Sequence, residues 1–113
     1  MNKGGVFMTY EELVECARNA TKKTQVSKAV GHMAYQFNVK GEAEGAFYIE
    51  IDDGRINVEP YEYYDRDVLI VTSADMLLKI IDGKIRALDA YANGQIMVYG
   101  DPRNLEYLMF SYV

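Results

Sequence analysis

The sequence contains only one cysteine and one histidine, and it has no long hydrophobic run. Cys16 cannot form a disulfide within the chain, so nothing indicates an oxidising compartment, and a cytoplasmic location is expected. His32 has no second histidine or cysteine in the spacing of a metal site. The apolar run at the N-terminus is too short for a signal peptide, and no segment reaches the roughly 18 apolar residues of a spanning helix. We therefore expect no cofactor, no bound metal and no stable membrane insertion.

Basic residues are also scarce, with 12 lysines and arginines against 17 acidic residues and a formal net charge of -5. Nucleic-acid binding depends on concentrated positive charge, so no nucleic-acid partner is expected. The basic stretch from Arg18 to Lys28 is interpreted as a solvated helix face. With 113 residues and 50% hydrophobic content, the chain is expected to fold as one domain over residues 1–113 around a sizeable core.

Recognisable catalytic motifs are missing as well. The sequence has no Gly-x-Ser-x-Gly elbow, no P-loop and no Gly-x-Gly-x-x-Gly turn. Asp52 and Asp53 fall at the tip of an expected hairpin, where acidic residues serve turn formation. An enzyme that uses Asp65 and Arg66 is the least favoured hypothesis. We expect a protein without catalytic residues.

What the sequence does contain is a clear succession of periodic segments. Thr9 and Glu12 have the spacing of a capping box, which predicts a helix start, and apolar residues follow at helical spacing. From Met33 the period changes to two, and the alternation continues beyond Asp53-Gly54, a pair that favours a tight hairpin. Residues 33–59 are therefore predicted to form a three-stranded antiparallel meander with one apolar face.

The second half alternates strands and helices. The continuous apolar run 68–71 predicts a strand that is buried on both faces. Thr72 or Ser73 is expected to cap a helix that ends at Asp82-Gly83. A short helix through residues 88–92, a strand over 96–100 and a final helix from Asp101-Pro102 complete the predicted order.

Residues 82–101 resemble the signature of the sterol carrier protein type 2 family. The matching positions are Gly83-Lys84, Ala90-Tyr91, Gly94, the strand 96–98 and Gly100-Asp101. Upstream segments also resemble the family, including its first strand at 35–39, its hairpin at 53–55, and its fourth strand with the following helix at 68–77. The order and spacing of these segments carry the resemblance, because no short motif among them is diagnostic.

The resemblance implies an α+β fold with a five-stranded, mostly antiparallel sheet and helices packed on one face. It also implies an apolar cavity for a fatty acid, acyl-CoA, phospholipid or sterol, bound by burial of methylene groups. Solid core is the alternative interpretation of the same side chains. The candidate ligand-binding residues are Phe37, Phe47, Ile49, Met76, Leu77, Ile80, Ile81, Tyr91, Met97, Leu105, Leu108 and Met109.

A tyrosine cluster, Tyr61, Tyr63 and Tyr64, lies in the connection after the third predicted strand. These rings are equally consistent with a cavity mouth, a homodimer contact or a simple surface loop. The rival to a lipid-binding domain is therefore a protein-interaction or dimerisation module with a filled core.

Overall fold

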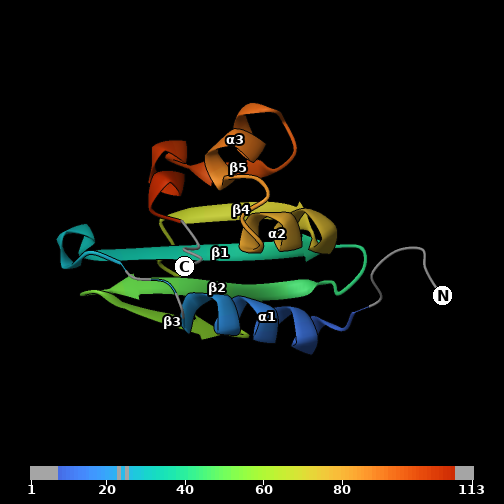
Figure 1. The fold of residues 1–113 in the computed structure, drawn as a ribbon, viewed down its shortest axis with the longest axis horizontal. Helices are drawn as coiled ribbons and strands as arrows, with labels where there is room; N and C mark the ends of the chain where they lie inside the picture. Colours follow the sequence, from blue (N-terminus) through green and yellow to red (C-terminus); the bar gives the residue numbers. More distant parts are fainter. Residues whose placement is uncertain (1–7, 23, 25, 109–113) are drawn as a thin grey trace.

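The computed structural model describes residues 8–22, 24 and 26–108. These residues form a five-stranded sheet with helices packed against one of its faces, as Figure 1 shows. The elements, in chain order, are α1 (Tyr10–Lys22), a short 3-10 helix η1 (Lys28–Val30), β1 (His32–Lys40), β2 (Gly45–Asp52), β3 (Arg55–Glu59), β4 (Val68–Ser73), α2 (Ala74–Ile81), α3 (Ala87–Ala92), β5 (Met97–Gly100) and a second 3-10 helix η2 (Pro102–Tyr107).

The strands are arranged in the order β3-β2-β1-β4-β5. Strands β1, β2 and β3 form the predicted antiparallel meander, and the β2–β3 hairpin turns at Asp53 and Gly54, both with positive φ. Strand β4 runs parallel to β1, while β5 returns antiparallel to β4. Because only one of the four strand pairings is parallel, the predicted α+β fold with a mostly antiparallel sheet is confirmed.

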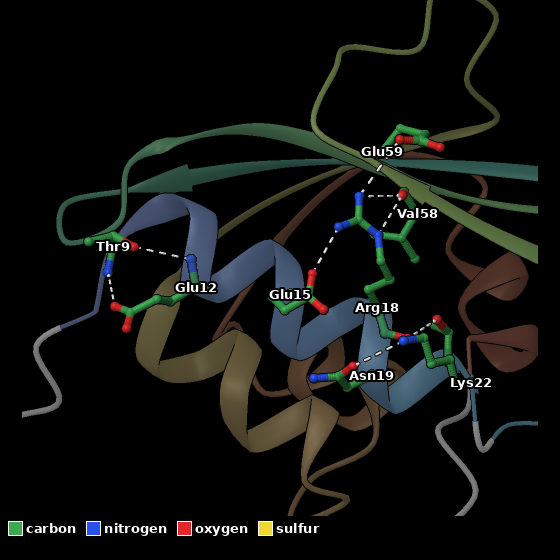
Figure 2. Close-up of polar contacts among 9 residues, drawn as sticks. Thr9, Glu12, Glu15, Arg18, Asn19, Lys22, Val58 and Glu59 are labelled. Carbon is green, nitrogen blue, oxygen red and sulfur yellow. Dashed lines mark hydrogen bonds and ion pairs between the residues drawn. The ribbon is translucent and has the colours of Figure 1, made fainter.

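Helix α1 begins with the predicted capping box. The Thr9 backbone N–H donates to Glu12 at 2.9 Å, and the Glu12 N–H donates to the Thr9 hydroxyl at 3.1 Å (Figure 2). Near the other end, two nitrogens of Arg18 donate to the backbone carbonyl of Val58 in β3, at 3.0 and 3.3 Å. A third nitrogen of Arg18 bonds to Glu15 at 2.9 Å. One guanidinium thus fastens α1 to the outermost strand of the sheet.

The core lies between the sheet and helices α1 and α2, which lie beside each other over the same face (Figure 1). Every second residue of β1 and β2 points into this layer, and Phe37 and Phe47 stack there with ring centroids 5.0 Å apart. Helix α2 begins at the Ser73 cap, as predicted, since the Ser73 hydroxyl accepts from the Met76 N–H at 3.1 Å. These contacts make the apolar face of the sheet the centre of the fold.

The opposite face of β4 differs from the prediction. Val68 and Ile70 are fully buried against the helices, but Leu69 and Val71 are only half-buried. The expectation that β4 is buried on both faces was therefore wrong. A continuous apolar run does not reveal whether a second layer covers the other side of a strand, and here no helix lies over Leu69 and Val71 among the described elements.

The segment after β5 also differs from the expected helix. Asp101 caps it as predicted, because its carboxylate accepts from the Arg103 N–H at 3.0 Å. The following turn is a 3-10 helix, η2, and it buries Leu105, with Leu108 immediately after its end. The Tyr35 hydroxyl of β1 donates to the Asn104 carbonyl at 2.7 Å. This bond ties η2 to the centre of the sheet.

Candidate functional site

Most of the residues predicted to bind a ligand come together in the layer between the sheet and the helices. Eight of them are at most 6% exposed and belong to one core cluster: Phe37, Phe47, Ile49, Leu77, Ile80, Ile81, Leu105 and Leu108. Met76 is partly buried and packs against the same cluster. Met109 lies outside the described residues. The structure thus places nine of the predicted side chains in or against a single apolar layer.

Two of the predicted residues lie on the surface instead. Tyr91 of α3 is 39% exposed, and Met97 of β5 is 56% exposed. In α3 the buried positions are Ala87 and Ala90, which leaves Tyr91 on the outer side of the helix. Met97 pairs with Val71, on the face of the sheet that points away from the helices. The alternation of β5 carried this signal, because side chains next to one another in a strand point to opposite faces.

A small apolar crevice opens from the core at the end of α1. Its volume is about 10 Å³, whereas sites that enclose a small molecule measure roughly 300–1,000 Å³. In the described residues this part of the sheet–helix layer is therefore packed, with room for about one water molecule. The crevice is lined by Thr21, Thr24, Val26, Ile49, Ile51, Ile56, Tyr107 and Leu108.

A polar pocket of about 230 Å³ adjoins this crevice. Three residues, Thr21, Thr24 and Ile56, line both spaces, so the apolar crevice and the polar recess are neighbours. Arg18 and Glu59 line the recess, and their charged groups are 3.7 Å apart.

The short helix η2 and Leu108 stand between this crevice and a second pocket. The second pocket measures about 120 Å³ and is lined by residues of α3 and by Leu105 and Leu108. Leu108 therefore contacts two separate spaces, one on each side of the chain that follows β5.

Burial is the largest of the causes that raise the pKa of Tyr35. The Tyr35 hydroxyl therefore keeps the proton that it donates to η2.

Sequence reasoning did not single out most of the residues that line the crevice. Thr21, Ile51 and Ile56 were placed correctly in the apolar stripe of α1 and in the alternation of the meander. Nothing in those patterns indicated that the end of α1, the hairpin and η2 meet at one place. That meeting depends on contacts between segments far apart in the chain.

Two charged residues of the connection after β3, Arg66 and Asp67, have structural partners. The Asp67 carboxylate accepts from the Ala34 backbone N–H at 2.8 Å, and Arg66 lies 3.4 Å from the side-chain oxygen of Gln36. Asp65 and Arg66 are exposed. Within residues 8–22, 24 and 26–108, no group of three His, Cys, Asp or Glu side chains is placed to hold a metal ion, and no helix there is long and apolar enough to cross a membrane.

A third pocket, of about 230 Å³, lies at the start of α2, where Lys40, Glu42 and Asp75 surround it. Its lining also includes Met8, Ala74 and Leu78, and none of the predicted ligand-binding residues. Predicted ligand-binding residues line the crevice at the end of α1, through Ile49 and Leu108, and the pocket beside η2, through Leu105 and Leu108.

Comparison with solved structures supports the fold. The chain resembles sterol carrier protein 2-like 2 from Aedes aegypti with 20% identity and a TM-score of 0.56, over 90% of this chain and 98% of that one. The palmitated form of that mosquito protein gives 17% identity and a TM-score of 0.54, over 89% and 91%. A stereoselective inverting sec-alkylsulfatase from Pseudomonas sp. gives 14% and 0.58, over 95% of this chain but only 15% of the enzyme.

A search of curated protein sequences gave no significant match. The sequence does match the family model described as the SCP-2 sterol transfer family over residues 11–109. This match spans both the sheet and all of the helices that enclose the apolar layer. The chain therefore belongs to the SCP-2 sterol transfer family.

Proposed function

We propose that the protein binds or transfers an apolar lipid, without catalysing a reaction, in the layer between its sheet and its helices. The observation that carries this proposal is the apolar crevice beside Ile49 and Leu108, which shares three lining residues with a polar recess at the surface. Family membership supports the same function, as does the palmitated state of the mosquito structure.

Lipid entry on this proposal requires the layer to open. Each methylene group moved from water into the core contributes about 0.8 kcal/mol, so an acyl chain supplies several kcal/mol toward that opening. Helix η2 is the element best suited to move, because it is a single short 3-10 helix that covers the core with Leu105. Its displacement, together with Leu108, would lengthen the crevice toward the Phe37–Phe47 stack.

The polar recess suits the head of a single-chain lipid. Its lining includes Thr21, Thr24 and Asn57, and Arg18 is already paired with Glu15 and Glu59. Among fatty acids, acyl-CoA esters, phospholipids and sterols, we propose an acyl lipid, and the mosquito protein's palmitate supports that choice.

The absence of catalysis and the cytoplasmic location are parts of the same proposal. The chain corresponds to only 15% of the sulfatase that it resembles, so that enzyme's activity says nothing of this chain. A dimerisation module with a filled core is a second candidate function. The packed core favours it, and so do the exposed side chains of Met97 and Tyr99 on the face of the sheet that points away from the helices.

The first experiment extracts the purified protein with organic solvent and identifies bound lipid by mass spectrometry, with a native mass spectrum to count ligands per chain. We expect one acyl lipid per chain. Absence of lipid, together with failure to take up a fluorescent fatty acid or acyl-CoA, would contradict the proposal.

A pair of variants tests the position of the site. Ile56 is half-buried and lines both the crevice and the recess, so Ile56→Trp is expected to reduce fatty-acid uptake at least tenfold. Leu78→Trp is the matched control, because Leu78 is also half-buried but lines the pocket at the start of α2. Equal uptake by two folded variants would show that the lipid enters elsewhere.

A further inference from the structure

The Tyr35 hydroxyl joins the middle of the sheet to the segment that follows β5. The Tyr35 side chain is fully buried in β1, which lies between β2 and β4. Its hydroxyl donates to the backbone carbonyl of Asn104 in η2 at 2.7 Å, between residues 69 positions apart in the chain. A phenylalanine ring would fill the same space in the core, so what the hydroxyl adds is this bond to η2.

Helix η2 has little else of a polar kind to hold it against the domain. The Asn104 N–H bonds back to Asp101, the Leu108 N–H bonds back to Leu105, and Arg103 pairs with Asp101. All of these contacts lie within the same short segment. In the part of the chain that the structure describes, no hydrogen bond or ion pair other than that of Tyr35 joins η2 to another element. Apolar contacts of the two leucines supply the rest of the attachment.

The two leucines of this segment have empty space beside them. Leu105 and Leu108 both line the pocket of about 120 Å³ next to α3, and Leu108 also lines the crevice at the end of α1. Side chains in a close-packed core are held in place because their neighbours leave no voids of this size. Leu105 and Leu108 therefore have room to shift.

Helix α1 is fastened to the same sheet more firmly. The Tyr10 hydroxyl, at the start of α1, donates to the backbone carbonyl of Ala46 in β2, and Arg18 bonds to Val58 in β3. Helix α1 thus has polar bonds to the sheet at two places along its length, whereas η2 has one. Opening η2 breaks the Tyr35 bond and leaves both bonds of α1 intact.

We propose that the hydrogen bond from Tyr35 to Asn104 holds η2 closed over the apolar layer and thereby limits the uptake of lipid. The inference rests on the lipid-binding function proposed above, in which lipid enters when η2 moves. A ligand that binds only the open state has an apparent affinity that is reduced by the fraction of molecules in that state. Tyr35 is thus a positioning residue, which acts on the ligand through η2.

Hydrogen exchange of η2 tests the proposal without any ligand. Tyr35→Phe removes the bond and keeps the ring, and Tyr10→Phe is the matched control, because it removes a tyrosine–carbonyl bond from α1. The amides of Asn104 and Leu108 are hydrogen-bonded in the closed state, so their exchange reports opening. Their exchange should accelerate about two- to tenfold in Tyr35→Phe, as expected for the loss of one hydrogen bond. It should stay unchanged in Tyr10→Phe, because the Tyr10 bond survives the opening of η2.

Uptake of a fluorescent fatty acid, followed by stopped flow, measures the consequence for binding. Tyr35→Phe should take up the probe faster and bind it about two- to tenfold more tightly than the wild-type chain, although it has lost a buried hydrogen bond. Damage to the fold, or loss of a direct contact with the ligand, would weaken binding instead. The direction of the change therefore separates a positioning role from a structural one. Tyr10→Phe should match the wild-type chain in rate and affinity.

Two results would overturn the proposal. In the first, the η2 amides would respond equally to the two substitutions, which would mean that η2 opens only when the whole domain unfolds. In the second, Tyr35→Phe would bind the probe no faster and no more tightly than the wild-type chain. If none of the three chains takes up the probe, the lipid-binding function itself fails, and hydrogen exchange alone then decides whether Tyr35 holds η2 closed.

Discussion

The two faces of the sheet are built from the same strands but bury very different proportions of their side chains. On the helix side, Phe37, Phe47 and Ile49 are at most 1% exposed. On the opposite face, which we term the open face, Met97 and Tyr99 are more than half exposed. The helix side gains its burial from α1, which precedes the strands in the chain, and from α2 and η2, which follow β4 and β5. The open face is covered only in part, by a connection held through hydrogen bonds. Most of the buried apolar side chains of the sheet therefore lie on the helix side.

The two faces should differ most in how much stability is lost when an aromatic side chain is replaced by alanine. Phe37→Ala removes a fully buried ring from the stack with Phe47 and should lower the free energy of unfolding by about 3–5 kcal/mol. Tyr99→Ala should lower it by less than about 1 kcal/mol. Urea unfolding of both variants at low protein concentration measures the comparison, and similar losses would contradict it.

The next largest loss of stability is expected at Gly100, the last residue of β5, which lies against Asp67 at the end of the connection. Its φ is 115°, and a Cβ there would lie 2.4 Å from the Asp67 carbonyl oxygen. Gly100→Ala therefore combines backbone strain with a clash against rigid backbone, for a cost of about 2–4 kcal/mol. Thermal unfolding measures it. A loss below about 1 kcal/mol would mean that β4 and β5 shift apart easily.

Removing the buried amide of the open face should have a moderate effect. Gln36→Leu leaves the Tyr63 N–H without its acceptor, at a cost of about 1–3 kcal/mol. The loss should be local, so hydrogen exchange of Tyr63 should accelerate while that of Phe37 changes little. If Phe37 accelerates equally, the connection stabilises the whole sheet and the two faces are not independent.

The connection should also respond to pH. The hydrogen bond to Glu50 raises the pKa of Tyr63 to about 12. Burial alone would raise the pKa of Glu50, but hydrogen bonds from His32 and Tyr63 outweigh it and hold that pKa below its ordinary value. The Tyr63 contribution is complete below about pH 10, the ordinary tyrosine pKa, and is lost as the pH rises through about 12. The Glu50 contribution is lost as the pH falls through its lowered pKa.

Ultraviolet titration of the tyrosines, compared between the wild-type chain and Glu50→Gln, measures this response. The variant should lower the pKa of Tyr63 toward the ordinary value. An unchanged titration curve would show that Glu50 does not hold the tyrosine in solution.

The smallest effect is expected at the most exposed ring. Tyr64→Ser should change the free energy of unfolding by no more than about 0.5 kcal/mol, because the side chain is 94% exposed. Differential scanning calorimetry at low protein concentration measures it. A larger loss would indicate that Tyr64 packs against the domain and does not merely border the open face.

Local patterns predicted the elements well, while the coverage of each face was harder to foresee. The Thr9 capping box, the Ser73 cap and the hairpin at Asp53-Gly54 were correct because each depends on neighbouring residues. The burial of Leu69 and the exposure of Tyr91 were misjudged because they depend on what packs above them. For the candidate site, sequence reasoning identified the apolar layer, but the crevice brings together segments more than 80 residues apart, such as Thr21 and Leu108.

The hydrogen bonds from Arg18 to Val58 have a consequence for self-assembly in the plane of the sheet. Strand β3 is an outermost strand, and such a strand offers unpaired backbone groups on which a strand from another molecule can add. Arg18 occupies the outward carbonyl of Val58 with two of its nitrogens and holds α1 beside it (Figure 2). A guanidinium in that place is expected to hinder the addition of another strand on that edge. The same contact that anchors a helix therefore also covers part of one edge of the sheet.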